Sequence, residues 1–148
     1  MNTQRTGIII ALLPVLFTIS AATAAACNYT YTVIDAEGRE VRISEGERAT
    51  LTQGESYILR MEYHENHRNC RVSPEETLYL LDGARWRLDR ETQPLLLTGM
   101  PEWIQPAPRT HRGEFAFTAS AAGDWLFEVV RVCDRGGYHG RFFLEVEL

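Results

Sequence analysis

Cysteines and histidines are the residues of this chain whose chemistry depends most on what lies beside them. Cys70 follows His64 and His67 in one polar segment, and Cys133 precedes His139 in another. In an oxidising compartment, a Cys70–Cys133 disulfide would close a long loop, which the chain-entropy model values at roughly 4 kcal/mol. Such a bridge would bring the three histidines to one end of the fold.

Three gathered imidazoles would suit copper or zinc, and Met61 could add a soft sulfur ligand for Cu(I). One hypothesis is therefore a metal site made of His64, His67, His139 and Met61. The other hypothesis is structural, because solvated histidines are ordinary in a segment as polar as this one. The spacing of three between His64 and His67 fits two ligands on a helical turn, but the segment has no helical pattern.

The third cysteine, Cys27, leaves an odd number of thiols. It follows a leader, residues 1–26, that is charged only at Arg5, is then apolar apart from Pro14, and ends in small residues. This order is typical of a cleavable secretory signal peptide. A membrane anchor is the weaker interpretation, because the unbroken apolar run is shorter than the roughly 20 residues that span a bilayer. We expect a periplasmic or secreted protein, exported by a bacterial-type route.

Cys27 has three alternative fates. It stands where a lipoprotein carries its acylated cysteine, although Ala24 occupies the position at which a lipobox favours leucine. Lipidation would tether the protein to a membrane without spanning it. The pairings Cys27–Cys70 and Cys27–Cys133 also remain open beside Cys70–Cys133.

No arrangement of residues predicts an enzyme. Cys133, His139 and Asp134 could be drawn as a catalytic group, but oxidation would remove the nucleophile. The serines lack a Gly-x-Ser-x-Gly context, and no phosphate-binding or dinucleotide-binding motif is present. All 15 basic residues are arginines, they are scattered, and 20 acidic residues give a net charge of −5. This charge argues against nucleic acid as a partner.

The elements that must position these residues have the period of two that is typical of strands. Segments with this alternation are 29–34, 39–43, 55–63, 77–81, 114–119, 125–132 and 141–148, with shorter candidates at 48–52 and 85–88. Seven to nine short strands over residues 27–148 predict one all-β domain, a β-sandwich of immunoglobulin-like or cupredoxin-like type. Trp86, Trp125 and Phe115 are expected in its core.

Three segments between the strands are expected to be loops, namely 64–76, 99–113 and 133–140. Trp103 and Tyr138 lie in two of them, and exposed aromatic residues are common anchors of protein interfaces. We therefore favour a non-enzymatic interaction domain that presents these loops to a protein partner in the cell envelope. Contact with a membrane would come only through a lipid on Cys27.

The last two strands resemble those of cupredoxins. Gly123-Asp124-Trp125-Leu126-Phe127 is similar to the start of that hairpin, and the segment from His139 to Val146 is similar to its His-x-Gly-x-Phe close. The resemblance covers only this C-terminal hairpin and implies a sandwich fold. In that family the intervening loop carries cysteine, histidine and often methionine ligands for copper. Here the cysteine is Cys133 rather than a residue near Val129, and no methionine follows His139.

A second resemblance is to chagasin-type cysteine-protease inhibitors, which are exported immunoglobulin-like domains. Gly113-Glu114-Phe115-Ala116-Phe117 and the Ala122-Gly123 turn look like later strands of that family. The resemblance implies protease inhibition, with Trp103 as a wedge. The Asn-Pro-Thr-Thr-Gly and Arg-Pro-Trp motifs of the inhibitory loops are absent.

Overall fold

The computed structural model describes residues 27–148 except 69 and 135, so the predicted signal peptide lies outside the described residues. This part of the chain forms eleven strands and one short 3-10 helix, which confirms the all-β prediction. The elements are β1 (Cys27–Ile34), β2 (Glu40–Ile43), β3 (Arg48–Thr52), β4 (Ser56–Glu65), η1 (Pro74–Glu76), β5 (Leu78–Leu81), β6 (Ala84–Arg85), β7 (Leu95–Leu97), β8 (Ile104–Ala107), β9 (Thr110–Ala119), β10 (Gly123–Arg131) and β11 (Tyr138–Glu147). No helix within these residues is long and apolar enough to cross a membrane.

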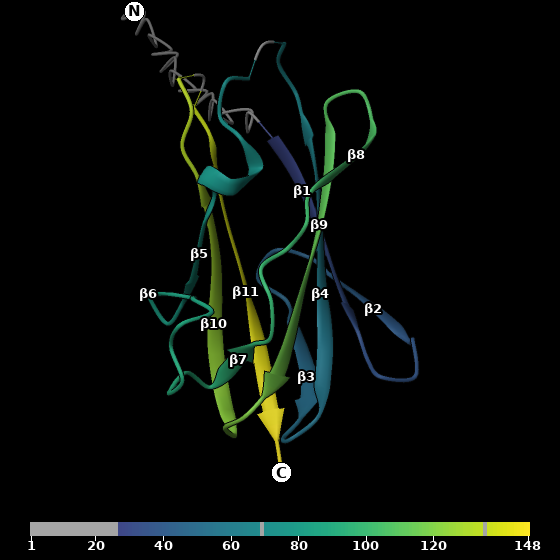
Figure 1. Cartoon of the computed structure of the whole chain (residues 1–148), viewed down its shortest axis with the longest axis vertical. Coiled ribbons are helices and arrows are strands. Elements are labelled where there is room, and N and C mark those ends of the chain that lie inside the picture. Colours follow the sequence, from purple (N-terminus) through teal and green to yellow (C-terminus); the bar gives the residue numbers. More distant parts are fainter. Residues whose placement is uncertain (1–26, 69, 135) are drawn as a thin grey trace, which may run out of the picture.

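The strands form two sheets (Figure 1). One sheet has the order β2-β1-β4-β9-β7, with β8 also paired to β9, and the other has the order β3-β11-β10-β5-β6. Neighbouring strands are antiparallel except β3 and β11, which run parallel. The two sheets bury their facing sides against each other, as alternation of apolar and polar residues requires.

The core lies between the sheets and is rich in aromatic residues. Phe115 on β9 and Phe127 on β10 contact Trp86, which is 4% exposed and lies just after β6. Trp86 and Phe115 are core residues, as predicted. Trp125 is only half-buried and packs against the edge of the core.

Several strands are longer than the sequence pattern suggested. β4 continues to Glu65, so His64 lies on a strand, and β11 begins at Tyr138, so His139 does too. Residues 99–113 were expected to be a loop, but they contain β8 and the start of β9. These extensions consist of polar residues and prolines that carry no apolar alternation. They are strands because they continue the backbone hydrogen bonding of a neighbouring strand, and β8 tolerates its Pro106 because it is an edge strand.

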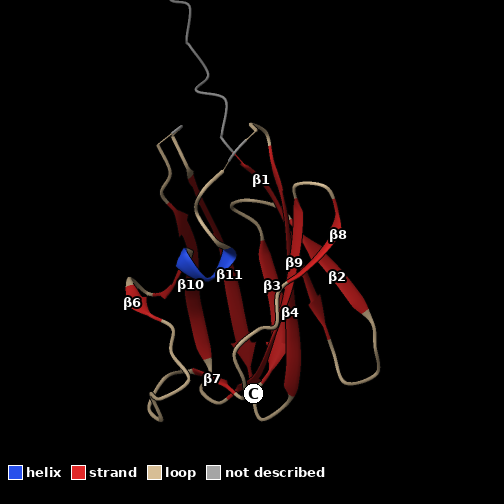
Figure 2. Cartoon of the chain, turned by 45° about the horizontal axis from the view of Figure 1, so that its top comes forward, coloured by secondary structure: helices blue, strands red, loops and turns tan. Residues whose placement is uncertain are grey.

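One end of the sandwich gathers segments that are far apart in the sequence (Figures 1 and 2). Here β4 is followed by residues 66–73 without 69, β10 is followed by residues 132–137 without 135, and β8 turns into β9 around Arg109. We call these three segments together the loop end. Cys27, the first residue of β1, lies at the same end because it pairs with Glu65, whereas the C-terminus lies at the opposite end.

Candidate functional site

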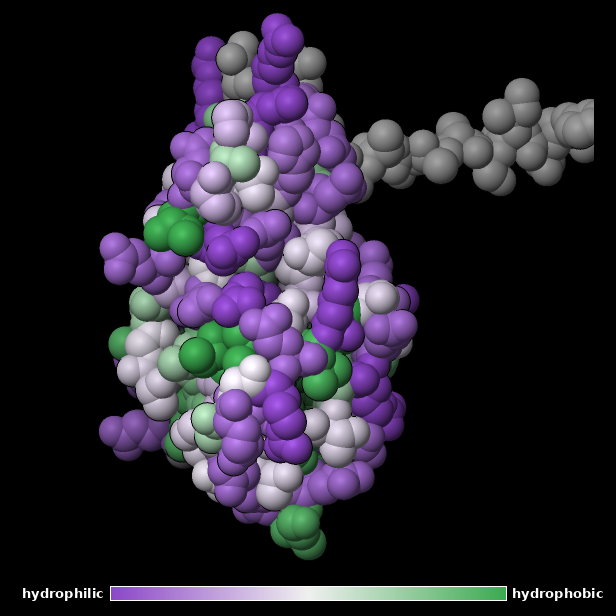
Figure 3. Space-filling view, turned by 90° about the vertical axis from the view of Figure 1, so that its right-hand side faces the viewer, coloured by the Kyte–Doolittle hydropathy of each residue, from purple (hydrophilic) through white to green (hydrophobic). Residues whose placement is uncertain are grey.

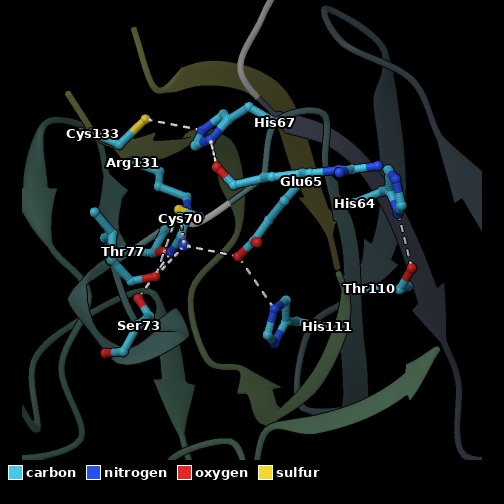
Figure 4. Close-up of polar contacts among 12 residues, drawn as sticks. His64, Glu65, His67, Cys70, Ser73, Thr77, Thr110, His111, Arg131 and Cys133 are labelled. Atoms are coloured by element: carbon cyan, nitrogen blue, oxygen red, sulfur yellow. Dashed lines mark hydrogen bonds and ion pairs between the residues drawn. The ribbon is translucent and has the colours of Figure 1, made fainter. Parts of the chain in front are cut away.

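A buried arginine lies at the loop end and forms hydrogen bonds with one of its segments (Figure 4). Arg131 is the last residue of β10, and its side chain is 0% exposed. Its guanidinium donates hydrogen bonds to the backbone carbonyls of Val72 and Ser73, to the hydroxyl of Thr77 (3.1 Å), and to the sulfur of Cys70 (3.5 Å). One side chain therefore joins the end of β10 to the segment that leads from Cys70 to β5.

Side chains of β4 balance the positive charge of this guanidinium. Tyr63 and Glu65 point inward because they continue the alternation of that strand. Arg131 Nη2 lies 3.7 Å from Glu65 Oε1, and the guanidinium lies over the Tyr63 ring at 4.6 Å from its centroid. Glu65 Oε1 also lies 3.3 Å from His111 Nε2, and His111 stacks on Tyr63. A buried charge is tolerated only with such partners.

Two cysteines lie beside this ion pair. Cys70 contacts Arg131 directly, and Cys27 is the cross-strand partner of Glu65 in the β1–β4 register. The Cys27 side chain is fully buried. Burial raises the pKa of its thiol, and the charge and hydrogen bonding of Arg131 partly offset that rise. Cys70 and Cys133 are close enough to affect the same pKa, so all three cysteines belong to one neighbourhood.

The third cysteine, Cys133, has a histidine partner. Its Sγ lies 3.7 Å from Nε2 of His67, and the other ring nitrogen, Nδ1, lies 3.3 Å from the carbonyl oxygen of Arg68. Because that carbonyl can only accept, the tautomer that satisfies both contacts has its proton on Nδ1. Nε2 is then free to accept the proton of the Cys133 thiol. The histidine beside Cys133 is therefore His67 rather than His139.

The predicted disulfide partners are both at the loop end. The structure has Cys27, Cys70 and Cys133 as free thiols. The Cys70–Cys133 pairing stays a prediction, as does lipidation of Cys27. The structure does add that the side chain of Cys27 points inward, into the neighbourhood of Arg131.

The residues predicted to bind metal are not brought together. His64 contacts the Thr110 hydroxyl on the outer face of one sheet, and His139 contacts Glu128 on the outer face of the other. Met61 is buried in the core between them. In residues 27–148 without 69 and 135, no group of three or more histidine, cysteine or acidic side chains is arranged to hold a metal ion. Strand alternation is the reason, because it sends these side chains to three different places.

The two predicted anchor residues pack against the domain. Tyr138 stacks on Tyr29 at 4.3 Å between ring centroids, and its hydroxyl is 2.8 Å from that of Tyr31. Trp103 is half-buried and lies over Gly113. Their role in partner binding remains a prediction. Only the part of each ring that faces away from the core could contact a partner.

The packing of Trp103 predicts the effect of one substitution. A Cβ at Gly113 would lie 2.9 Å from the indole ring, so Gly113→Ala should push Trp103 outward. We expect a red shift of tryptophan fluorescence and a loss of about 1–3 kcal/mol of unfolding free energy in urea, as for other overpacked sites. Gly99→Ala is the matched control, because a Cβ there meets nothing within 4 Å. Equal spectra and stabilities for the two variants would contradict this packing.

The outer surface of the loop end is polar and carries arginines (Figure 3). Arg68, Arg71 and Arg109 are exposed, and none of the ion pairs formed within the described residues involves them. Val132, which follows β10 at the same end, is 74% exposed. This combination of unpaired arginine and exposed apolar side chain is common in protein interfaces.

Sequence reasoning missed Arg131 and Glu65, although a signal for both exists. Phe127 and Val129 alternate with polar residues on β10, and Arg131 occupies the next inward position. On β4, Glu65 likewise occupies the next inward position after Met61 and Tyr63. Two opposite charges at inward positions near the ends of strands indicate a buried ion pair.

Comparison with known proteins does not assign the chain to a family. No protein-family model matches the chain, and no curated protein matches it.

Proposed function

We propose that this protein is an exported binding domain that presents its loop end to a protein partner outside the cytoplasm. The observation that carries the proposal is the gathering of residues 66–73, the β8–β9 turn and residues 132–137 above one buried guanidinium. Export rests on the leader-like residues 1–26.

We propose that the sandwich has an immunoglobulin-type topology, in which β1, β4, β5, β7, β9, β10 and β11 would be the strands A to G. The order β1-β4-β9-β7 is then A-B-E-D, and β11-β10-β5 is G-F-C. Folds of this type carry their variable binding loops at one end of the sandwich, which is where the loop end lies.

Hydrogen bonds connect the segments of the loop end to the sandwich in the absence of a partner. Arg131 fixes the carbonyls of Val72 and Ser73, and the backbone N–H of Glu65 donates to the carbonyl of Arg109. Gly137 packs against the backbone of Arg131, where a Cβ would lie 2.1 Å from the carbonyl oxygen. Ordering loops in advance lowers the entropy that association must overcome, so it favours a binding role.

The exposed arginines indicate the chemistry of the partner. Arg68, Arg71 and Arg109 are exposed on segments of the loop end, on a chain whose net charge is −5, and we call these three residues the basic tip. Carboxylates on the partner would pair with these guanidiniums through charge-assisted hydrogen bonds. The proposed partner surface is therefore acidic, with an apolar contact for Val132.

Site-specific crosslinking in intact cells tests the proposal. A photo-crosslinking residue at position 132 should give a partner adduct that an excess of unmodified protein competes away. The same residue at position 55 should not, because Glu55 is exposed at the opposite end of the sandwich. Changing Arg68, Arg71 and Arg109 together to glutamate should abolish the adduct and leave the thermal unfolding temperature within a few degrees of the parent.

Two outcomes would contradict the proposal. One is that positions 132 and 55 capture the same proteins equally well. The other is that the triple arginine variant crosslinks as strongly as the parent, which would show that the basic tip takes no part.

A further inference from the structure

We propose that Cys133, Cys70 and Cys27 form a disulfide relay, in which a disulfide formed at the surface moves through Cys70 to the buried Cys27. This inference concerns the thiols beneath the loop end and goes beyond binding of a partner. It does not depend on the partner's identity.

Cys70 is the central member because the structure connects it to both of the others. On one side, Cys70 and Cys27 lie around the same guanidinium, that of Arg131. On the other side, the segment that carries Cys70 also carries His67, which contacts Cys133. Cys27 and Cys133 belong to the same neighbourhood, but among the described residues no hydrogen bond joins both of them to one side chain. Cys70 can therefore pair with either neighbour.

The three sulfurs differ in access, which gives the relay a direction. Cys133 and Cys70 are half-buried, whereas Cys27 is 0% exposed. An external disulfide can reach Cys133, where Nε2 of His67 is placed to take the thiol proton. Cys27 can be oxidised only by a disulfide that is already inside the protein.

The steps balance with a small-molecule disulfide such as oxidised glutathione as the oxidant. The Cys133 thiolate attacks it and forms a mixed disulfide, releasing one glutathione thiolate. Cys70 then loses its proton to water and attacks the sulfur of Cys133, so that Cys70–Cys133 forms and a second glutathione thiolate leaves, which takes up a proton from water. Finally Cys27 attacks Cys70, Cys27–Cys70 forms, and Cys133 leaves as a thiolate that regains its proton from His67 or water. The net change is two protein thiols oxidised and one glutathione disulfide reduced.

The last step needs a base and a cation inside the protein, and both are present. Glu65 is the cross-strand neighbour of Cys27, a position in which Cβ atoms lie about 4.5–5.5 Å apart. We infer that its carboxylate takes the Cys27 proton, because the two side chains leave paired strands on the same buried face. The guanidinium of Arg131 then stabilises the thiolate, which would otherwise be disfavoured by burial. Glu65 and Arg131 thus position and activate Cys27 for attack on Cys70.

Disulfide mapping of the protein expressed from its full-length chain tests the relay. Reduced protein is mixed with oxidised glutathione, quenched with acid at increasing times, alkylated after denaturation, and digested with trypsin. Trypsin separates the three cysteines, because arginines at positions 39, 68, 71, 131 and 135 flank them. We expect Cys70–Cys133 to appear first and Cys27–Cys70 to grow at its expense.

Single substitutions separate the two steps. Cys27→Ser should stop the reaction at Cys70–Cys133. His67→Gln should slow the first step and leave the conversion to Cys27–Cys70 unchanged. Glu65→Gln should slow that conversion on the order of a hundredfold, the usual contribution of a general base, without slowing the first step. If Glu65→Gln does not fold, the parent and the other two variants still decide the outcome.

Three results would overturn the relay. Cys27 could remain a thiol at every time while Cys70–Cys133 forms completely. Cys27–Cys133 could be the main product. Mass spectrometry could also find the sulfur of Cys27 covalently blocked in the purified protein, as a lipid would do.

Discussion

Arg131→Ala is expected to lower the free energy of unfolding by about 3–5 kcal/mol, which is the range found when one member of a buried ion pair is removed. The guanidinium is 0% exposed and donates to the carbonyls of Val72 and Ser73. Without it, those carbonyls lose a donor, and the buried Glu65 carboxylate loses its cationic partner. Urea unfolding followed by circular dichroism measures the loss.

Arg85→Ala is the control for Arg131→Ala, because Arg85 also lies on a strand but is exposed. We expect it to change stability by about 0.5 kcal/mol or less. In a double-mutant cycle, Arg131→Met combined with Glu65→Gln should cost less than the sum of the single changes, because no unpaired charge is left. Additive losses would show that Glu65 does not balance the charge of Arg131.

The fold class could be predicted from the sequence because it depends on a local pattern. Alternation on β4 and β11 indicated two-faced strands, and the aromatic residues at inward positions indicated the core. The order of the strands could not be predicted, because it depends on pairing between distant segments. The parallel pair of β3 with β11 is one example, since nothing local in residues 48–52 indicates it.

The candidate site was predicted only in part, for a related reason. The loops around Cys70 and Cys133 were expected at one end, and they are. His64 and His139 were expected to meet there; both lie near this end, but on strands whose outer faces carry the two side chains away from each other. Neighbours in sequence point to opposite faces of a sheet, so an error of a few residues in where a strand begins sends a side chain to the wrong place. The inward position of Arg131 follows from the same rule.

The buried ion pair also connects the thiols to the surface that we propose for partner binding. Arg131 holds the carbonyls that shape residues 70–77 and contacts the sulfur of Cys70. A disulfide from Cys70 to Cys133 would join two segments of the loop end, whereas one from Cys70 to Cys27 would join a segment to β1. In the relay that we propose, movement of the disulfide would therefore change which segments of the loop end are covalently connected.

Trp86→Ala is expected to have an effect as large as that of Arg131→Ala, but through the core. Trp86 packs against Phe115, Phe117 and Phe127, which belong to both sheets, and its Nε1–H donates to the carbonyl of Leu95 at 2.7 Å. Removing a buried indole leaves a cavity, and such changes cost about 3–5 kcal/mol. Circular dichroism during urea unfolding measures the loss without relying on tryptophan emission.

Trp86→Phe separates the packing of the indole from its hydrogen bond. The phenyl ring fills most of the space, but the carbonyl of Leu95 loses its side-chain donor, so we expect a loss of about 1–3 kcal/mol. Trp125→Ala should cost less than Trp86→Ala, because Trp125 is only half-buried. A loss for Trp86→Ala no greater than that for Trp125→Ala would mean that the two sheets do not meet around Trp86. None of these core variants alters a side chain of the loop end, so each should keep its crosslink at position 132 under conditions in which it is folded.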